Sequence, residues 1–164
     1  MFWTALALYV SPSAIHDSQE RRNAPKCHPR TRAKELAAVK KWSREPINPQ
    51  TKKKFLWVTG LQGCGKSAFL GTIADDHREG DGVAESFFFP QDAGLTKINL
   101  LATLVYQLAH HPDLGRFGAE LRASLQAKPL LMTKSFIAQL RILLLTPLRK
   151  AIHHELPSDR IPQD

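Results

Sequence analysis

Eight consecutive residues combine three glycines with a lysine and a serine, in the order Gly60-Leu61-Gln62-Gly63-Cys64-Gly65-Lys66-Ser67. Glycines at this spacing allow backbone conformations and a close approach of the main chain that a β-carbon would obstruct. The backbone N–H groups of such a loop, together with the N-terminus of a following helix, can hold phosphate groups. The pattern is that of a Walker A loop, and it predicts binding of a nucleoside triphosphate, ATP or GTP, with Mg²⁺.

The side chains of this loop have different expected roles. Lys66 is expected to reach the β- and γ-phosphates, and the hydroxyl of Ser67 is expected to bind the magnesium ion that bridges phosphate oxygens. The other non-glycine residues of the loop, Leu61, Gln62 and Cys64, are expected to contribute backbone amides more than side chains. Two alternatives stay open, an ordinary glycine-rich turn with a surface lysine and a redox role for Cys64 beside a helix N-terminus.

The elements on either side of the loop must position it. The apolar residues 55–59 predict a buried strand, and the apolar positions among residues 68–74 predict a helix that runs to about Asp76. Residues 83–89, which end in three phenylalanines, predict a second strand covered on both faces. Together these elements predict an α/β fold, the three-layer α/β/α arrangement of a P-loop NTPase with a parallel sheet. The sheet is incomplete, because about two strands are visible where such a fold needs about five.

Four more segments have apolar residues at helical spacing. Thr31 is expected to cap a helix that ends before Pro46, and Thr96 is expected to cap a second helix. A third helix is expected after Pro112, and a fourth from about Thr133, although residues 142–145 alone could form a strand. Residues 1–30 predict a partly irregular lead-in segment, and residues 31–164 the N-terminal part of one NTPase domain.

The chain has 164 residues, 43% of them apolar, and a net charge of +8. This size and composition predict one globular unit. About half of the basic residues lie between Arg21 and Lys54, where the only acids are Glu35 and Glu45. This cluster is either a solvated linker or an anion-facing surface. Because no aromatic residues alternate with the charges, no specific nucleic-acid partner is expected.

No apolar run approaches the roughly 20 residues that cross a bilayer, and the first residues lack a basic leading segment. A cytoplasmic protein without membrane association is therefore expected. Cys27 and Cys64 are expected to be reduced thiols, since one bridge is not a disulfide scaffold. Cys27-His28 and the two histidine pairs lack the spacing of a zinc site, and solvated or capping histidines are expected.

Hydrolysis in this class of NTPase needs an acidic residue at the end of another apolar strand, where it holds the magnesium shell. After residue 90 no apolar run ends in Asp or Glu. Four acids do not fit the role, because they lie on the helix after the loop or follow a polar stretch: Asp75, Asp76, Asp159 and Asp164. The catalytic residues are therefore unassigned, and hydrolysis is not predicted.

Many further residues occur in the order found in a known family. They are Ala14-Ile15-His16-Asp17-Ser18, Arg21, Cys27, Thr31-Arg32, Trp42, Leu56-Trp57-Val58, Lys66-Ser67-Ala68, Ser86-Phe87-Phe88-Phe89, Tyr106-Gln107-Leu108-Ala109, Lys134, Gln139 and Thr146-Pro147-Leu148. The chain thus resembles the start of a fungal NACHT-type NTPase domain of the STAND class of signal-transduction ATPases, and it is also similar to the nephrocystin-like N-terminal NTPase domain. The resemblance covers about residues 14–150.

This resemblance implies a nucleotide-controlled switch, with protein partners or self-association by family analogy. The chain departs from the family at Pro90 and Gln91, where a basic residue is usual, and in lacking the acidic Walker B strand. The alternatives are an interaction module that does not hydrolyse nucleotide, a phosphate-transferring kinase, and a truncated fragment without activity or a stable fold.

Overall fold

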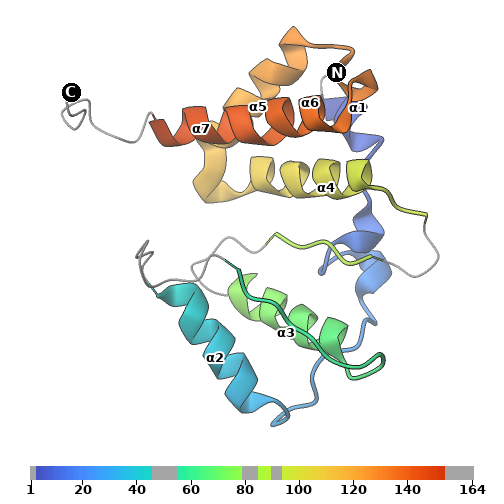
Figure 1. The fold of residues 1–164 in the computed structure, drawn as a ribbon, viewed down its shortest axis with the longest axis vertical. Coiled ribbons are helices and arrows are strands. Elements are labelled where there is room, and N and C mark those ends of the chain that lie inside the picture. Colours follow the sequence, from blue (N-terminus) through green and yellow to red (C-terminus); the bar gives the residue numbers. More distant parts are fainter. Residues whose placement is uncertain (1–2, 46–54, 79–84, 90–93, 154–164) are drawn as a thin grey trace, which may run out of the picture. The chain divides into compact units, whose positions relative to one another are not determined.

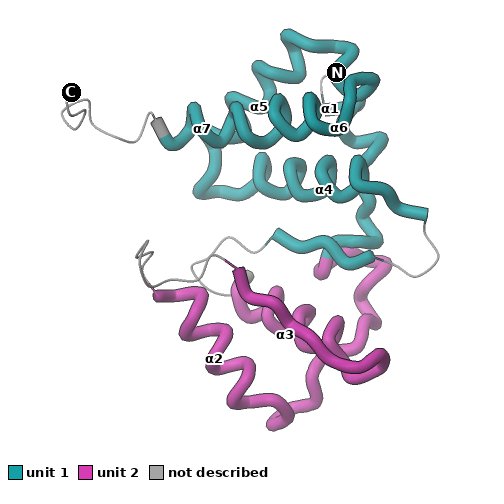
Figure 2. The backbone as a smooth tube through the Cα atoms, viewed as in Figure 1, with its two compact units in different colours: residues 1–15, 85–164 teal, residues 16–84 magenta. Residues whose placement is uncertain are grey.

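The computed structural model describes residues 3–45, 55–78, 85–89 and 94–153. The chain divides into two compact units, residues 1–15 with 85–164 and residues 16–84 (Figure 2). Some features singled out in the sequence lie outside the described residues: Lys52–Lys54, Gly80–Gly82, residues 83–84, Pro90–Gln91, His154, Asp159 and Asp164. The predicted boundary at residue 30 stays a prediction.

The predicted parallel sheet is absent from the described residues, which form helices and no strand (Figure 1). The prediction of an α/β fold with the three-layer α/β/α architecture of a P-loop NTPase is therefore wrong. A strand is stabilised by hydrogen bonds to a neighbouring strand, and neither apolar run finds such a neighbour among the described residues. The two runs differ in their exposure and in their hydrogen bonds.

Residues 55–59 form no regular secondary structure and are largely exposed, instead of forming a buried strand. The side chains of Phe55 and Trp57 are each 87% exposed, and Leu56 is 46% exposed. Hydrophobicity and β-propensity favour a strand only where a pleated surface can be covered. In the unit of residues 16–84, the described elements pack on one another as helices, and they offer this segment no sheet edge.

Residues 85–89 form no regular secondary structure, and hydrogen bonds that partly replace those of a sheet hold them. Gln107 accepts from the Ser86 N–H at 3.3 Å and donates to the Ser86 carbonyl at 2.9 Å, and the Phe88 N–H donates to the Ala14 carbonyl at 2.7 Å. Phe89 is 64% exposed. The prediction of a strand with both faces covered is therefore wrong for residues 85–89. The Gln107 side chain, and not a neighbouring strand, bonds the backbone of Ser86, and Phe89 is exposed.

The unit of residues 1–15 and 85–164 is built on helices, some of which the sequence pattern predicted. They are α1 (Trp3–Ala7), η1 (Pro12–Ala14), α4 (Lys97–His110), η3 (Pro112–Leu114), α5 (Gly115–Ala127), η4 (Leu131–Thr133), α6 (Phe136–Leu140), η5 (Arg141–Leu145) and α7 (Thr146–His153). α5 packs against both α4 and α7. The predicted helices after Thr96, Pro112 and Thr133 are confirmed, and residues 142–145 are helical.

The cap of α4 and the ties to the first residues of the chain fix this unit further. The Thr96 N–H donates to Asn99 Oδ1 at 2.9 Å, which satisfies a donor at the start of the helix. Asn99 Nδ2 donates to the Tyr9 carbonyl at 3.1 Å, and the buried hydroxyl oxygen of Thr103 accepts from the Ser11 N–H at 2.9 Å. Sequence reasoning gave residues 1–30 no packing role, yet Leu6 is completely buried.

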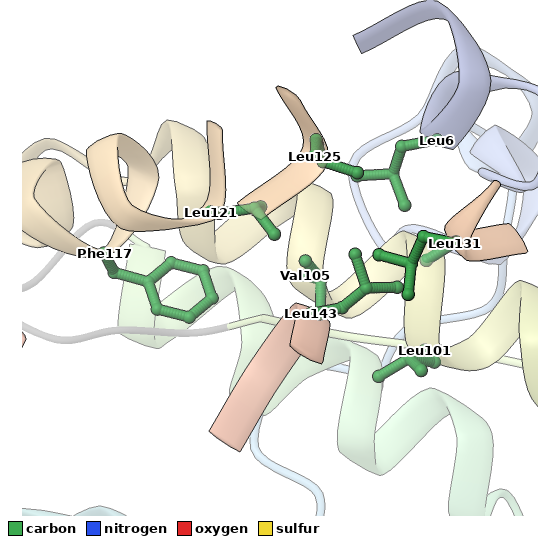
Figure 3. Close-up of a cluster of buried hydrophobic side chains, with 9 residues drawn as sticks. Leu6, Leu101, Val105, Phe117, Leu121, Leu125, Leu131 and Leu143 are labelled. Carbon is green, nitrogen blue, oxygen red and sulfur yellow. The ribbon is translucent and has the colours of Figure 1, made fainter. Parts of the chain in front are cut away.

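A single hydrophobic cluster holds these helices together. Its buried members are Leu6, Leu101, Ala102, Val105, Phe117, Leu121, Leu125, Leu131 and Leu143, each at most 6% exposed. Figure 3 shows the labelled leucines and Val105 gathered between segments that are distant in sequence. Burying one of the larger of these side chains contributes about 1.5–3 kcal/mol, so the cluster is a main source of the stability of this unit.

A π-helical turn lies immediately before a proline. η5 has five residues, and the Thr146 N–H donates to the Arg141 carbonyl. Pro147, the second residue of α7, has no N–H, and a proline ring in a regular helix collides with the carbonyl four residues earlier, here that of Leu143. The wider turn accommodates Pro147, which is fully buried, while Leu143 keeps its place in the core.

The unit of residues 16–84 contains η2 (Gln19–Arg21), α2 (Ala33–Arg44) and α3 (Lys66–Arg78). Both α-helices were predicted and are confirmed. The predicted cap is wrong: Arg32 occupies the N-cap of α2, while the Thr31 hydroxyl donates to the His28 carbonyl at 2.6 Å. Among the described residues, no helix has the length and apolar character needed to cross a membrane.

Candidate phosphate-binding loop

The backbone of the loop uses two of its glycines in the left-handed region. Gly63 has φ +77° and Gly65 has φ +83°, conformations that glycine adopts without the clash of a β-carbon. A β-carbon on Gly63 would meet no heavy atom within 4 Å. A backbone hydrogen bond from the Cys64 N–H to the Leu61 carbonyl, at 3.3 Å, closes the turn formed by residues 61–64. The glycine roles inferred from the sequence are thus consistent with the loop conformation at these two positions.

The first glycine has a different reason. Gly60 is not among the residues with positive φ, but a β-carbon there would lie 2.7 Å from the Cys64 sulfur. That separation is shorter than any normal contact, so the thiol would have to turn away. Gly60 therefore makes room for the side chain of Cys64 within the loop, and both cysteines are free thiols.

α3 begins within the eight-residue motif, at Lys66. The Phe69 N–H donates to the Gly65 carbonyl at 2.9 Å, the first helical hydrogen bond. The N–H groups of Lys66, Ser67 and Ala68 precede this bond, so they have no acceptor within the helix. Amides in this position, and the positive end of the helix dipole, favour an anion.

The ammonium of Lys66 is folded back over the loop. Its Nζ donates to the Gly60 carbonyl at 2.9 Å and to the Leu61 carbonyl at 2.8 Å, and it lies 3.9 Å from the Cys64 sulfur. An ammonium has three donors, so two of them are satisfied by neutral carbonyl groups. The positive charge is therefore held at the loop, beside the first turn of α3, without a carboxylate partner among these contacts.

Arg32 brings a second positive charge to the loop. Its guanidinium donates to the carbonyl of Cys64 and lies 5.8 Å from the centroid of the Phe69 ring. In the sequence, Arg32 is only one of the residues shared with a known family, and no role in the site is expected of it. The density of basic residues in this region was the signal, but 28 positions of chain separate Arg32 from Gly60 and only the tertiary structure brings them together.

A further basic residue lies farther along α3. Lys26 Nζ lies 2.7 Å from Asp75 Oδ2 and donates to the Gly71 carbonyl at 3.2 Å, while the Cys27 N–H donates to the Thr72 hydroxyl oxygen at 3.0 Å. These bonds attach residues 26–27 to the second half of α3. Asp75 is thus paired with a lysine on the second half of α3.

The remaining side chains of the loop do not indicate a ligand of another chemical class. Leu61 is 84% exposed, and Gln62 and Ser67 are also exposed. The hydroxyl of Ser67 is an oxygen donor of the kind that Mg²⁺ accepts, and it lies one residue after the lysine in the first turn of α3. The donor set therefore fits a magnesium triphosphate in its chemistry.

A family model described as Nephrocystin 3, N-terminal, matches residues 34–156 of the chain. The match includes the loop and α3, and it begins just after Arg32. The similarity to a nephrocystin-like N-terminal domain expected from the sequence is thereby confirmed. Neither the search of curated proteins nor the search of solved structures found a match.

Proposed function

We propose that this chain, which belongs to the Nephrocystin 3, N-terminal, family, binds a nucleoside triphosphate through residues 60–67 at the N-terminus of α3. One observation carries the proposal: the ammonium of Lys66 is held over the loop by two neutral carbonyls, 2.9 and 2.8 Å away. A phosphate group is a stronger acceptor for an ammonium than a carbonyl is. Triphosphate binding, as proposed, uses only the loop and the start of α3 and requires no sheet.

Binding would use three kinds of group. The amides of the first turn of α3 would donate to phosphate oxygens, since they have no helical acceptor. Lys66 would leave the carbonyls of Gly60 and Leu61 and place its charge on the terminal phosphates. The left-handed conformations of Gly63 and Gly65 would keep the main chain close to the anion.

Magnesium would reach the site with the nucleotide. The Ser67 hydroxyl would contribute one oxygen ligand, and the ion would neutralise part of the phosphate charge. We include a NACHT-type switch in this proposal, fungal in origin, cytoplasmic, and acting with protein partners or by self-association. Its support is the set of residues that the chain shares with such domains in sequence order. The nucleoside triphosphate of this proposal is ATP or GTP.

The test is thermal unfolding of the whole chain with and without Mg-ATP or Mg-GTP. Nucleotide at 100 times its dissociation constant should stabilise the folded state by about 2.7 kcal/mol. Lys66→Ala should abolish the shift, and Lys34→Ala, a change at an exposed lysine in the first turn of α2, should leave it in place. The nucleotide that gives the larger shift is the preferred ligand.

A cooperative transition that neither nucleotide moves would contradict triphosphate binding and favour an interaction module instead. A shift that survives Lys66→Ala would place the nucleotide elsewhere on the chain and would equally contradict the proposal. Repeating the titration with EDTA in place of Mg²⁺ separates the contribution of the metal from that of the loop.

A further inference from the structure

The position of the Arg32 guanidinium is not explained by the loop motif. It donates to the Cys64 carbonyl, and a β-carbon on Gly65 would lie 3.7 Å from its Nη2 atom. Its Cζ atom lies 5.8 Å from the centroid of the Phe69 ring, the first residue of α3 to make a helical bond. The guanidinium therefore covers the junction between the loop and α3, where the phosphates are proposed to bind.

On the basis of the proposed function, we propose that Arg32 is a second phosphate-binding residue and that it couples α2 to occupation of the loop. A guanidinium forms paired, charge-assisted hydrogen bonds to phosphate oxygens, and these are stronger than a bond to a neutral carbonyl. A bound triphosphate therefore competes with the carbonyl of Cys64 for Arg32. The phosphate would compete in the same way with the Gly60 and Leu61 carbonyls for the ammonium of Lys66.

Arg32 is linked to α2 through its backbone. It is the N-cap residue, with φ +53° and ψ +27°, and its carbonyl accepts from the Leu36 N–H at 2.9 Å, which is the first bond of the helix. A change in the group that binds the Arg32 side chain therefore acts on the first turn of α2.

Arg30 offers a matched control. It has the same charge as Arg32 and a similar left-handed conformation, φ +70°, and it is exposed. Among the described residues its side chain makes no hydrogen bond or ion pair, whereas that of Arg32 contacts the loop. Arg30→Gln and Arg32→Gln thus change the net charge equally, and only the second removes a group from the loop.

The first measurement is calorimetric titration of the whole chain with Mg-ATP and Mg-GTP. Arg32→Gln should raise the dissociation constant for the triphosphate by about tenfold or more, the usual effect of losing a hydrogen bond to a charged group. Its effect on the nucleoside monophosphate should be smaller, because fewer phosphate oxygens are present. Arg30→Gln should stay within about twofold of the unaltered chain in both titrations, since its charge lies away from the loop.

The second measurement is hydrogen exchange of the unaltered chain, which does not depend on the folding of any variant. Saturating triphosphate should slow the exchange of the first α2 amides, from Leu36 to Lys40, several-fold, because Arg32 would then be held by a stronger partner. The amides of α5, which belongs to the other compact unit, serve as the reference.

The outcomes separate the two proposals. If the unaltered chain binds no triphosphate, or Lys66→Ala binds it equally well, the proposed function fails and this inference falls with it. If Lys66→Ala abolishes binding but Arg32→Gln behaves as Arg30→Gln does, the function stands and the role of Arg32 is overturned. Unchanged exchange in α2 on saturation would overturn the coupling even if Arg32→Gln cannot be purified in a folded form.

Discussion

The Ser43 hydroxyl oxygen and His77 Nε2 lie 2.8 Å apart and join α2 to α3 near their C-terminal ends. The opposite end of α2 meets the loop before α3 through Arg32 and the Cys64 carbonyl. α2 is therefore attached to α3 and its loop at two places, one near each end of the helix. His77 is itself fixed, since its Nδ1 lies 2.9 Å from the Ile73 carbonyl oxygen.

We expect Ser43→Ala to lower the free energy of unfolding by about 0.5–1.5 kcal/mol, because a partly buried hydrogen bond between two helices is lost. A double-mutant cycle with His77→Ala, measured by urea unfolding, should show a coupling of similar size. If the two single changes were additive, the contact between these side chains would contribute nothing to the packing of α2 on α3.

Gly65→Ala should destabilise the chain by about 1–2 kcal/mol, because alanine is strained at a φ of +83°. Gly71→Ala is the matched control within α3. Gly71 has no positive φ, and its added β-carbon would make only an ordinary contact with the movable Lys26 side chain. This control should be neutral or stabilising, by up to about 1 kcal/mol. Equal unfolding midpoints for the two variants would contradict the loop conformation.

Gly118 in α5 is required for the close approach of α5 to the end of α4. A β-carbon there would lie 2.6 Å from the Ala109 carbonyl oxygen, a backbone atom that cannot turn aside. Gly118→Ala should therefore cost about 1–3 kcal/mol, as expected for overpacking. Gly115→Ala, three residues earlier, should be tolerated, because φ is −55° and no heavy atom lies within 4 Å of the added carbon. Thermal unfolding of the two variants decides this.

Burial raises the pKa of Glu85, and the charge of His111 opposes this effect. A carboxyl group whose pKa is higher in the folded state than in the unfolded state binds more protons when folded, so stability falls as pH rises between the two values. Above that window Glu85 destabilises the fold, and below it the effect vanishes. Glu85→Gln should therefore raise Tm at about pH 7 and leave it unchanged at about pH 3.5. A gain that persists at the lower pH would point to packing instead.

The sequence determined most of the helices after residue 30 and the conformation of the candidate loop, because both depend on interactions that are short in sequence. The apolar residues of α4 recur at helical spacing, and Thr96 and Asn99 form its cap within four residues. The Gly60–Ser67 motif likewise predicted the left-handed glycines and the helix that begins at Lys66. Local hydrogen bonds and backbone freedom are encoded where they act.

Only the tertiary structure decided whether the two apolar runs, residues 55–59 and 85–89, form strands. A strand forms only when another segment supplies its hydrogen-bond partners. Residues 85–89 are instead bound by the side chain of Gln107, and Trp57 in the other run is left exposed. Distance along the chain also hid the burial of Leu6 and the contact of Arg32 with the loop. Such pairings depend on the packing of whole helices, which periodicity within any single segment does not specify.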